Sequence, residues 1–199
     1  LSAMAPPSNV PRVQNLVPGE TAEQALAAIT AHLELFSPSV APEVHIAFPP
    51  SADASELRER IEALVTYAQC GAGQRAAKTA WDSIALVTRL FEARGWDVYK
   101  GGAAPDPQAY DREGAWGPTK GGEPTTALGV VLLAAHTRAM LDQGKALTVS
   151  LPGVAALASL SLRQVQTLRE GGEFGREIAG GVSSVQALKW LKGRNVAGF

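Results

Sequence analysis

Residues 148–194 read TVSLPGVAALASLSLRQVQTLREGGEFGREIAGGVSSVQALKWLKGR, and this stretch decides the predicted fold of the chain. Ser150 is a favourable N-cap residue, and Pro152 is tolerated in the first turn of a helix because no N–H is needed there. These signals predict a short helix that ends after about two turns. Its small apolar face is formed by Val154, Ala155, Leu157 and Ala158.

A second helix is predicted directly after the first. Ser161 and Gln164 have the spacing of a capping box, and Gly171 with Gly172 ends the helix in the usual C-terminal way. Two short helices joined by a tight turn make a helix-turn-helix. The residues predicted to face outward from the second helix are Arg163, Gln164, Gln166, Thr167 and Arg169. Such side chains can hydrogen-bond base edges and phosphates.

The segment 173–181 is long enough for a small hairpin, with Gly175 or the Gly180–Gly181 pair available for its turn. A third helix is then predicted from Ser183, with Gln186 completing another capping box. The apolar residues of that helix are Val185, Leu188, Trp190 and Leu191. The order helix, turn, helix, hairpin, helix is that of a winged helix.

The runs VSLPGVAALASLSLRQVQTLREGG and GGVSSVQALKWL resemble the DNA-binding domains of the mercury-resistance-regulator (MerR) and excisionase group. In that group a capped recognition helix ends in a glycine-containing turn, a wing follows, and a serine-initiated helix closes the domain. The resemblance covers the C-terminal quarter of the chain and nothing upstream. It differs from the group in two ways: the domain is C-terminal rather than N-terminal, and no aromatic residue stands at the wing tip.

The predicted DNA-binding residues follow from this arrangement. Ser161 caps the recognition helix 161–170, whose outward side chains would enter the major groove. Basic residues that flank this helix, or lie on the wing and third helix, would contact phosphates. The complete predicted set is Ser161, Arg163, Gln164, Gln166, Thr167, Arg169, Arg176, Lys189, Lys192 and Arg194.

Charge is unevenly distributed along the 199 residues, although the formal net charge is only −1. From Lys145 onward there are seven lysines and arginines and three glutamates, which gives a net charge of +4. The preceding residues carry eleven basic and sixteen acidic side chains, a net charge of −5. A basic end on an acidic body is the distribution expected of a DNA-binding module joined to a part that does not touch DNA.

The N-terminal part predicts a helical domain at residues 20–144, preceded by a flexible arm at 1–19. A capping box from Thr21 to Gln24 is expected to start its first helix. The further predicted helices cover residues 54–70, 74–94 and 125–142. A short strand at 44–48 is expected to pair with a second strand at 96–99. A long loop is predicted at 100–123. The winged helix-turn-helix then occupies 145–199, which makes the predicted fold class mainly α.

The helix at 125–142 is apolar on most sides, so it is expected to be buried in the domain core or between two copies of the chain. Together with the helix at 74–94, it favours a homodimer formed by the helical domain. The single cysteine, Cys70, fits a reducing compartment, and neither a membrane-spanning run nor a signal peptide is recognised, so a cytoplasmic protein is expected.

The histidines His32, His45 and His136 are scattered and no nucleophile or metal-ligand motif is present, so no enzyme, cofactor or metal is predicted. A catalytic site assembled from distant residues is left open. The preferred hypothesis is a sequence-specific double-stranded DNA-binding protein, either a transcriptional regulator or an accessory factor of a mobile element. The alternatives are a protein–protein adaptor that uses the winged helix as a scaffold, and a helical hairpin with a purely structural role.

Overall fold

The computed structural model describes residues 11–36, 54–71, 73–92, 97–101, 123–144, 147–175 and 181–199. It is mainly helical with a small two-stranded sheet, as the sequence predicts at this coarse level. In chain order the elements are η1 (Val13–Asn15), α1 (Pro18–Phe36), α2 (Ala54–Cys70), α3 (Gly73–Glu92), α5 (Ala127–Asp142), β1 (Thr148–Val149), α6 (Leu151–Ala158), α7 (Leu162–Glu170), β2 (Val182–Ser183) and α8 (Ser184–Gly193).

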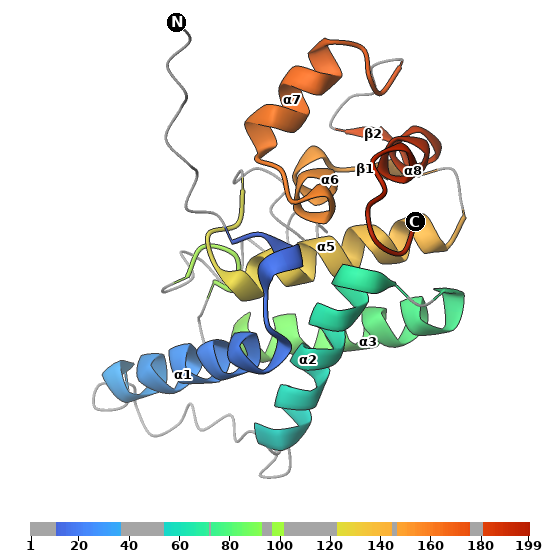
Figure 1. The fold of residues 1–199 in the computed structure, drawn as a ribbon. Coiled ribbons are helices and arrows are strands. Elements are labelled where there is room, and N and C mark those ends of the chain that lie inside the picture. The colour runs from blue at the N-terminus through green and yellow to red at the C-terminus, as the bar shows by residue number, and fades with distance from the viewer. Residues whose placement is uncertain are drawn as a thin grey trace, which may run out of the picture.

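Helix α5 lies in the middle of the molecule, between a layer of α1, α2 and α3 and a second layer of α6, α7 and α8 (Figure 1). The Thr126 side chain caps its start by accepting from the Gly129 N–H at 2.9 Å. Its sequence is apolar on most sides, and α5 accordingly packs against helices of both layers. Its buried residues are Leu128 to Ala135, Thr137, Arg138, Ala139 and Leu141.

The N-terminal layer begins earlier than the sequence predicts. Residues 11–19 were expected in a flexible arm, but Val13 is fully buried and its carbonyl accepts from Gln69 Nε2 at 2.9 Å. Helix α1 begins at Pro18, so the predicted capping box at Thr21 is wrong. Thr21 is instead a buried residue of the first turn, and its N–H donates to the Val17 carbonyl at 2.9 Å.

The prediction of a strand at 96–99 is also wrong for residues 97–99, which the structure describes. Residues 97–101 form a turn, in which Asp97 Oδ1 accepts from the N–H groups of Tyr99 and Lys100 at 2.8 and 3.0 Å. An aspartate that bonds its own downstream backbone in this way favours a turn over a strand. Its expected partner at 44–48 and most of the loop at 100–123 lie outside the described residues.

The two strands of the sheet lie on either side of the α6–α7 pair in sequence. Strand β1 precedes α6 and pairs antiparallel with β2, with Thr148 opposite Ser183 and Val149 opposite Val182. Strand β2 thus pairs with the segment before α6. Most of the segment 173–181, where a small hairpin was expected, lies outside the described residues. Gly181 permits this pairing, because a Cβ there would overlap the Val149 carbonyl oxygen.

Helix α8 follows β2 without the predicted capping box. Ser183 is its N-cap residue but makes no side-chain capping bond. Ser184 Oγ instead accepts from the Leu147 N–H at 3.1 Å, which ties the helix start to the segment before β1. Of its apolar residues, Trp190 and Leu191 are buried, whereas Val185 is 66% exposed.

A single hydrophobic core extends through both predicted domains. It contains residues of α2, α3 and α5 together with Val154, Leu157 and Val165 of the C-terminal helices. The boundary expected near residue 145 therefore does not interrupt the core. Since α5 is covered by helices of its own chain, its apolar sequence is explained without a second copy.

Candidate nucleic-acid interface

Helix α6 packs against α5 and sets the position of α7, which follows it directly in the chain. The Ser150 side chain caps α6 by accepting from the Gly153 N–H at 3.2 Å, as predicted. Gly153 allows α6 to approach α5 closely, because a Cβ there would overlap Oγ1 of the buried Thr137. The orientation of α6 is therefore set by close packing against the central helix.

The turn between α6 and α7 is closed by backbone hydrogen bonds. Ser159 adopts the left-handed conformation with φ of 53°. The Leu160 N–H donates to the Ala155 carbonyl at 3.0 Å and the Ser159 N–H to the Ala156 carbonyl at 3.3 Å. This is the Schellman arrangement that commonly ends a helix, and it turns the chain sharply into the next one.

The predicted capping box of α7 is present. Ser161 Oγ accepts from the Gln164 N–H at 3.2 Å, and Gln164 Oε1 accepts from the Ser161 N–H at 2.9 Å. At the other end, the left-handed Gly172 ends the helix as predicted, with the Glu173 N–H donating to the Leu168 carbonyl at 3.1 Å. Both ends of α7 are thus fixed by local bonds.

The side chains of α7 divide between an inner and an outer face. Val165 is fully buried, and Leu162 and Leu168 are partly buried against the core. The exposed side chains on the outer face include Arg163, Gln164, Gln166 and Thr167, whereas Arg169 is partly buried. The structure therefore brings the predicted base-contacting residues together on one exposed helical surface.

These four polar side chains are not equally available. The Gln164 amide is engaged in the capping box, and Thr167 Oγ1 donates to the Arg163 carbonyl at 3.0 Å. Within the described part of the chain, the side chains of Arg163 and Gln166 have no hydrogen-bond partner. Arg163 and Gln166 are therefore the α7 side chains best able to make new hydrogen bonds.

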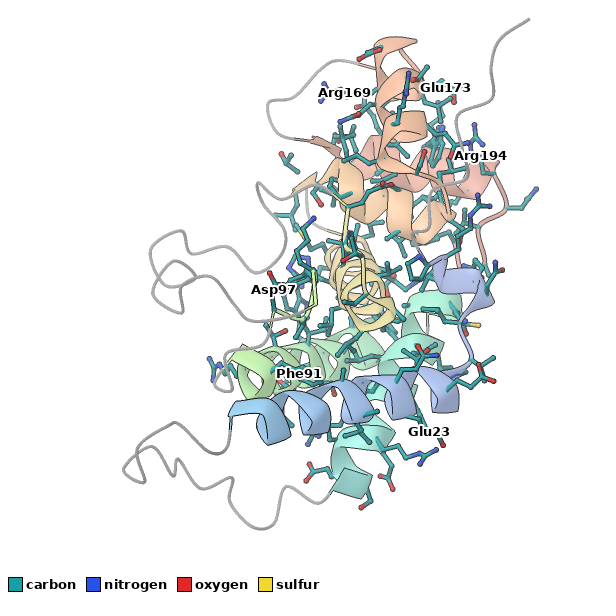
Figure 2. All side chains as sticks on the ribbon, turned by 90° about the vertical axis from the view of Figure 1, so that its left-hand side faces the viewer. Glu23, Phe91, Asp97, Arg169, Glu173 and Arg194 are labelled. Atoms are coloured by element: carbon teal, nitrogen blue, oxygen red, sulfur yellow. The ribbon has the colours of Figure 1, made fainter. Side chains whose placement is uncertain are left out.

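The residues predicted to contact phosphates differ in how available their side chains are. Lys189 and Lys192 are exposed on α8, and Arg176 lies outside the described residues. Arg194 is partly engaged: its guanidinium lies 3.9 Å from the Glu173 carboxylate and 4.5 Å from the centre of the Trp190 ring. Figure 2 shows Arg169, Glu173 and Arg194 at the same end of the molecule.

Sequence reasoning missed the role of Glu173. Its Oε2 accepts from Trp190 Nε1 at 2.8 Å, and the Trp190 ring packs against buried Phe174 at 4.8 Å between ring centres. The link joins the end of α7 to α8. No sequence signal predicts it, because the two residues belong to different elements.

An acidic side chain at the start of α7 was also missed. Glu123 Oε1 accepts a hydrogen bond from the Leu162 N–H, in the first turn of the helix. Lys100 Nζ donates to the Glu123 backbone carbonyl at 2.8 Å, and the Thr125 N–H donates to the Tyr99 carbonyl at 2.7 Å. The turn at 97–101 therefore fixes the segment that carries this carboxylate.

Among the described residues, the groups with a shifted pKa lie outside α7: three are core residues, and the fourth is the partly exposed Arg58, whose pKa is raised by its hydrogen bond to Glu23. Burial and a 2.7 Å hydrogen bond to Asp142 raise the pKa of Tyr67. Burial lowers the pKa of His136 and of Arg138. Among the described residues, no group of three or more His, Cys, Asp or Glu side chains could hold a metal ion.

In comparisons with protein-family models, curated protein sequences and solved structures, the chain has no significant match. The described helices include none with the length and apolar character needed to span a membrane. The features that indicate a function are therefore the α6–α7 surface and its charges.

Proposed function

We propose that this protein binds double-stranded DNA sequence-specifically and that α7 reads the major groove. The observation that carries the proposal is the outer face of α7, where Arg163 and Gln166 are exposed and hydrogen-bonded to nothing in the described part of the chain. An arginine can bond guanine O6 and N7 in a bidentate manner, and a glutamine can bond adenine N6 and N7 in the same way. Their helix is anchored by Val165 and fixed at both ends, so these side chains are presented on a rigid support.

The charge distribution supports the same proposal. Lys189 and Lys192 on α8 are exposed, and the C-terminal part carries a net charge of +4 against −5 for the rest. Phosphate contacts by such residues supply affinity for any sequence, whereas base contacts supply the preference. We assign Arg169 and Arg194 weaker phosphate contacts, because Arg169 is partly buried and Arg194 already lies beside Glu173.

We also propose that the C-terminal part of the chain is a winged helix-turn-helix. A winged helix-turn-helix accounts for the order of α6, α7, β2 and α8, with the segment between α7 and β2 as its wing and Arg176 as a phosphate contact on it. Gln164 and Thr167 would then act mainly by shaping α7, and a direct base contact by Gln164 would require its capping bond to open. We further propose a cytoplasmic transcriptional regulator or mobile-element accessory factor. It would bind DNA as a homodimer, because a single small module makes few base contacts and two copies on a two-fold site double them.

The proposal is tested first by selecting preferred sites from random duplexes with the full chain. Replacing Arg163 or Gln166 by Ala should then cost about 1–3 kcal/mol of binding free energy on the selected site. Arg89→Ala is the matched control for Arg163→Ala, because it removes the same charge from the exposed surface of α3, on the other side of α5. It should leave the affinity for the selected site unchanged.

Salt dependence separates DNA binding from an adaptor function. The logarithm of the association constant should fall linearly with the logarithm of salt concentration, and a Lys189→Ala/Lys192→Ala double variant should flatten the slope by roughly one unit per lost contact. If the full chain selects no duplex and shows no salt-dependent DNA binding, the DNA-binding proposal is wrong and a protein partner is favoured.

A further inference from the structure

Glu123 lies at the N-terminal end of α7. Its carboxylate accepts from the Leu162 N–H, although it lies 39 residues away in the sequence. The N–H groups at a helix start and the helix dipole together attract anions, and DNA-binding proteins use helix N-termini for phosphate contacts. An acidic side chain at this position therefore competes with phosphate for the same donors.

The start of α7 does not need Glu123 in order to form. The Ser161–Gln164 capping box already satisfies the N–H groups of both residues. Capping boxes of this kind start helices without help from distant segments. The additional carboxylate thus occupies the Leu162 N–H, which the capping box leaves without a partner.

The position of Glu123 is set by neighbours outside the α6–α7 pair. Lys100 Nζ bonds its backbone carbonyl, and the following Pro124 is buried. The carboxylate itself is only partly buried, so solvent and ions reach it. Only its side chain needs to rotate away for the Leu162 N–H to become available.

We propose that Glu123 is an autoinhibitory contact, which occupies the N-terminus of α7 in the free protein and leaves it when a DNA phosphate binds. This inference rests on the proposed function, since it concerns the regulation of the same surface. The carboxylate lowers affinity for every sequence, because it opposes a phosphate rather than a base. It therefore weakens binding to selected and random DNA by about the same factor.

The test compares the full wild-type chain with Glu123→Gln by fluorescence anisotropy on a selected duplex and on a random duplex. Glu123→Gln should bind both duplexes about three- to tenfold more tightly, and the gain should shrink as salt screens the charge. Glu59→Gln is the matched control, because it changes the net charge equally at an exposed site of α2. It should change affinity less than about twofold, because salt screens an exposed charge far from α7.

A second measurement distinguishes autoinhibition from simple capping. In the wild-type chain, the amide resonance of Leu162 should move on saturation with DNA as its bond to Glu123 is replaced. An unmoved Leu162 resonance, or Glu123→Gln binding no more tightly while Arg163→Ala still weakens binding, overturns the inference and leaves the proposed function standing. If neither the wild type nor Glu123→Gln binds any duplex, the proposed function fails and the inference fails with it. Binding by Glu123→Gln alone supports both.

Discussion

Helices α5 and α7 differ in how many of their residues contribute to the core. Helix α5 buries twelve of its 16 residues, whereas α7 buries only Val165 among its nine. Substitutions in α5 should therefore change the stability of the whole chain. Substitutions on the outer face of α7 should leave stability nearly unchanged and affect what the protein binds.

The two helices also use arginine in opposite ways. Arg138 of α5 is fully buried, and its guanidinium donates to the carbonyls of Ala68, Ala197 and Gly198. It also lies 4.0 Å from the centre of the Phe199 ring. All of these contacts hold the last residues of the chain against α2 and α5. Arg163 of α7 is exposed and makes no such contacts within the described residues, which leaves it available to a partner.

The largest expected effect is on the core. Leu132→Ala should lower the free energy of unfolding by about 2–5 kcal/mol, because it opens a cavity at a fully buried position. Urea denaturation of the full chain measures this loss. Leu168→Ala on partly buried α7 is the comparison, and it should cost clearly less. Equal losses would contradict the contrast between the two helices.

A smaller effect is expected from the arginines. Arg138→Met should destabilise the chain by about 1–3 kcal/mol, because the carbonyls that it bonds lose their donors. Arg163→Met should change stability by less than about 0.5 kcal/mol, as exposed substitutions usually do. Denaturation of both variants tests the difference, and a similar cost for the two would show that Arg163 also has a structural role.

The smallest expected effect concerns pH and again involves α5. Burial lowers the pKa of His136 from 6.5, so the unfolded chain binds more protons than the folded chain between the two values. Stability should therefore fall as pH is lowered through 6.5, with no contribution from this residue above that range. His136→Phe retains a ring against Trp81, which lies 4.6 Å away between ring centres, but cannot be protonated. Its stability should depend less on pH in this window; an unchanged dependence would assign the effect to other groups.

The parts of the fold that the sequence predicted correctly depend on local signals. The caps at Ser150 and Ser161 and the glycine end at Gly172 involve bonds between residues three to five positions apart, so spacing alone reveals them. The predictions at Thr21 and Ser183 failed because Pro18 begins α1 one turn earlier and because Ser184 bonds the distant Leu147.

The features missed at the candidate site depend on tertiary contacts. Glu123 reaches Leu162 across 39 residues, and Glu173 reaches Trp190 across a change of element. No periodicity or spacing encodes such contacts. Burial of α5 within one chain was likewise beyond the sequence, because an apolar helix has the same pattern whether its own chain or a second copy covers it.

The central claim is that the outer face of α7 binds DNA without supporting the fold, and Gln166→Ala tests it most directly. The variant should unfold within about 0.5 kcal/mol of the wild type, since Gln166 is exposed. On the selected duplex it should lose about 1–3 kcal/mol of binding free energy, because a base contact is removed. Wild-type affinity for the selected duplex in a stably folded Gln166→Ala variant would contradict the claim.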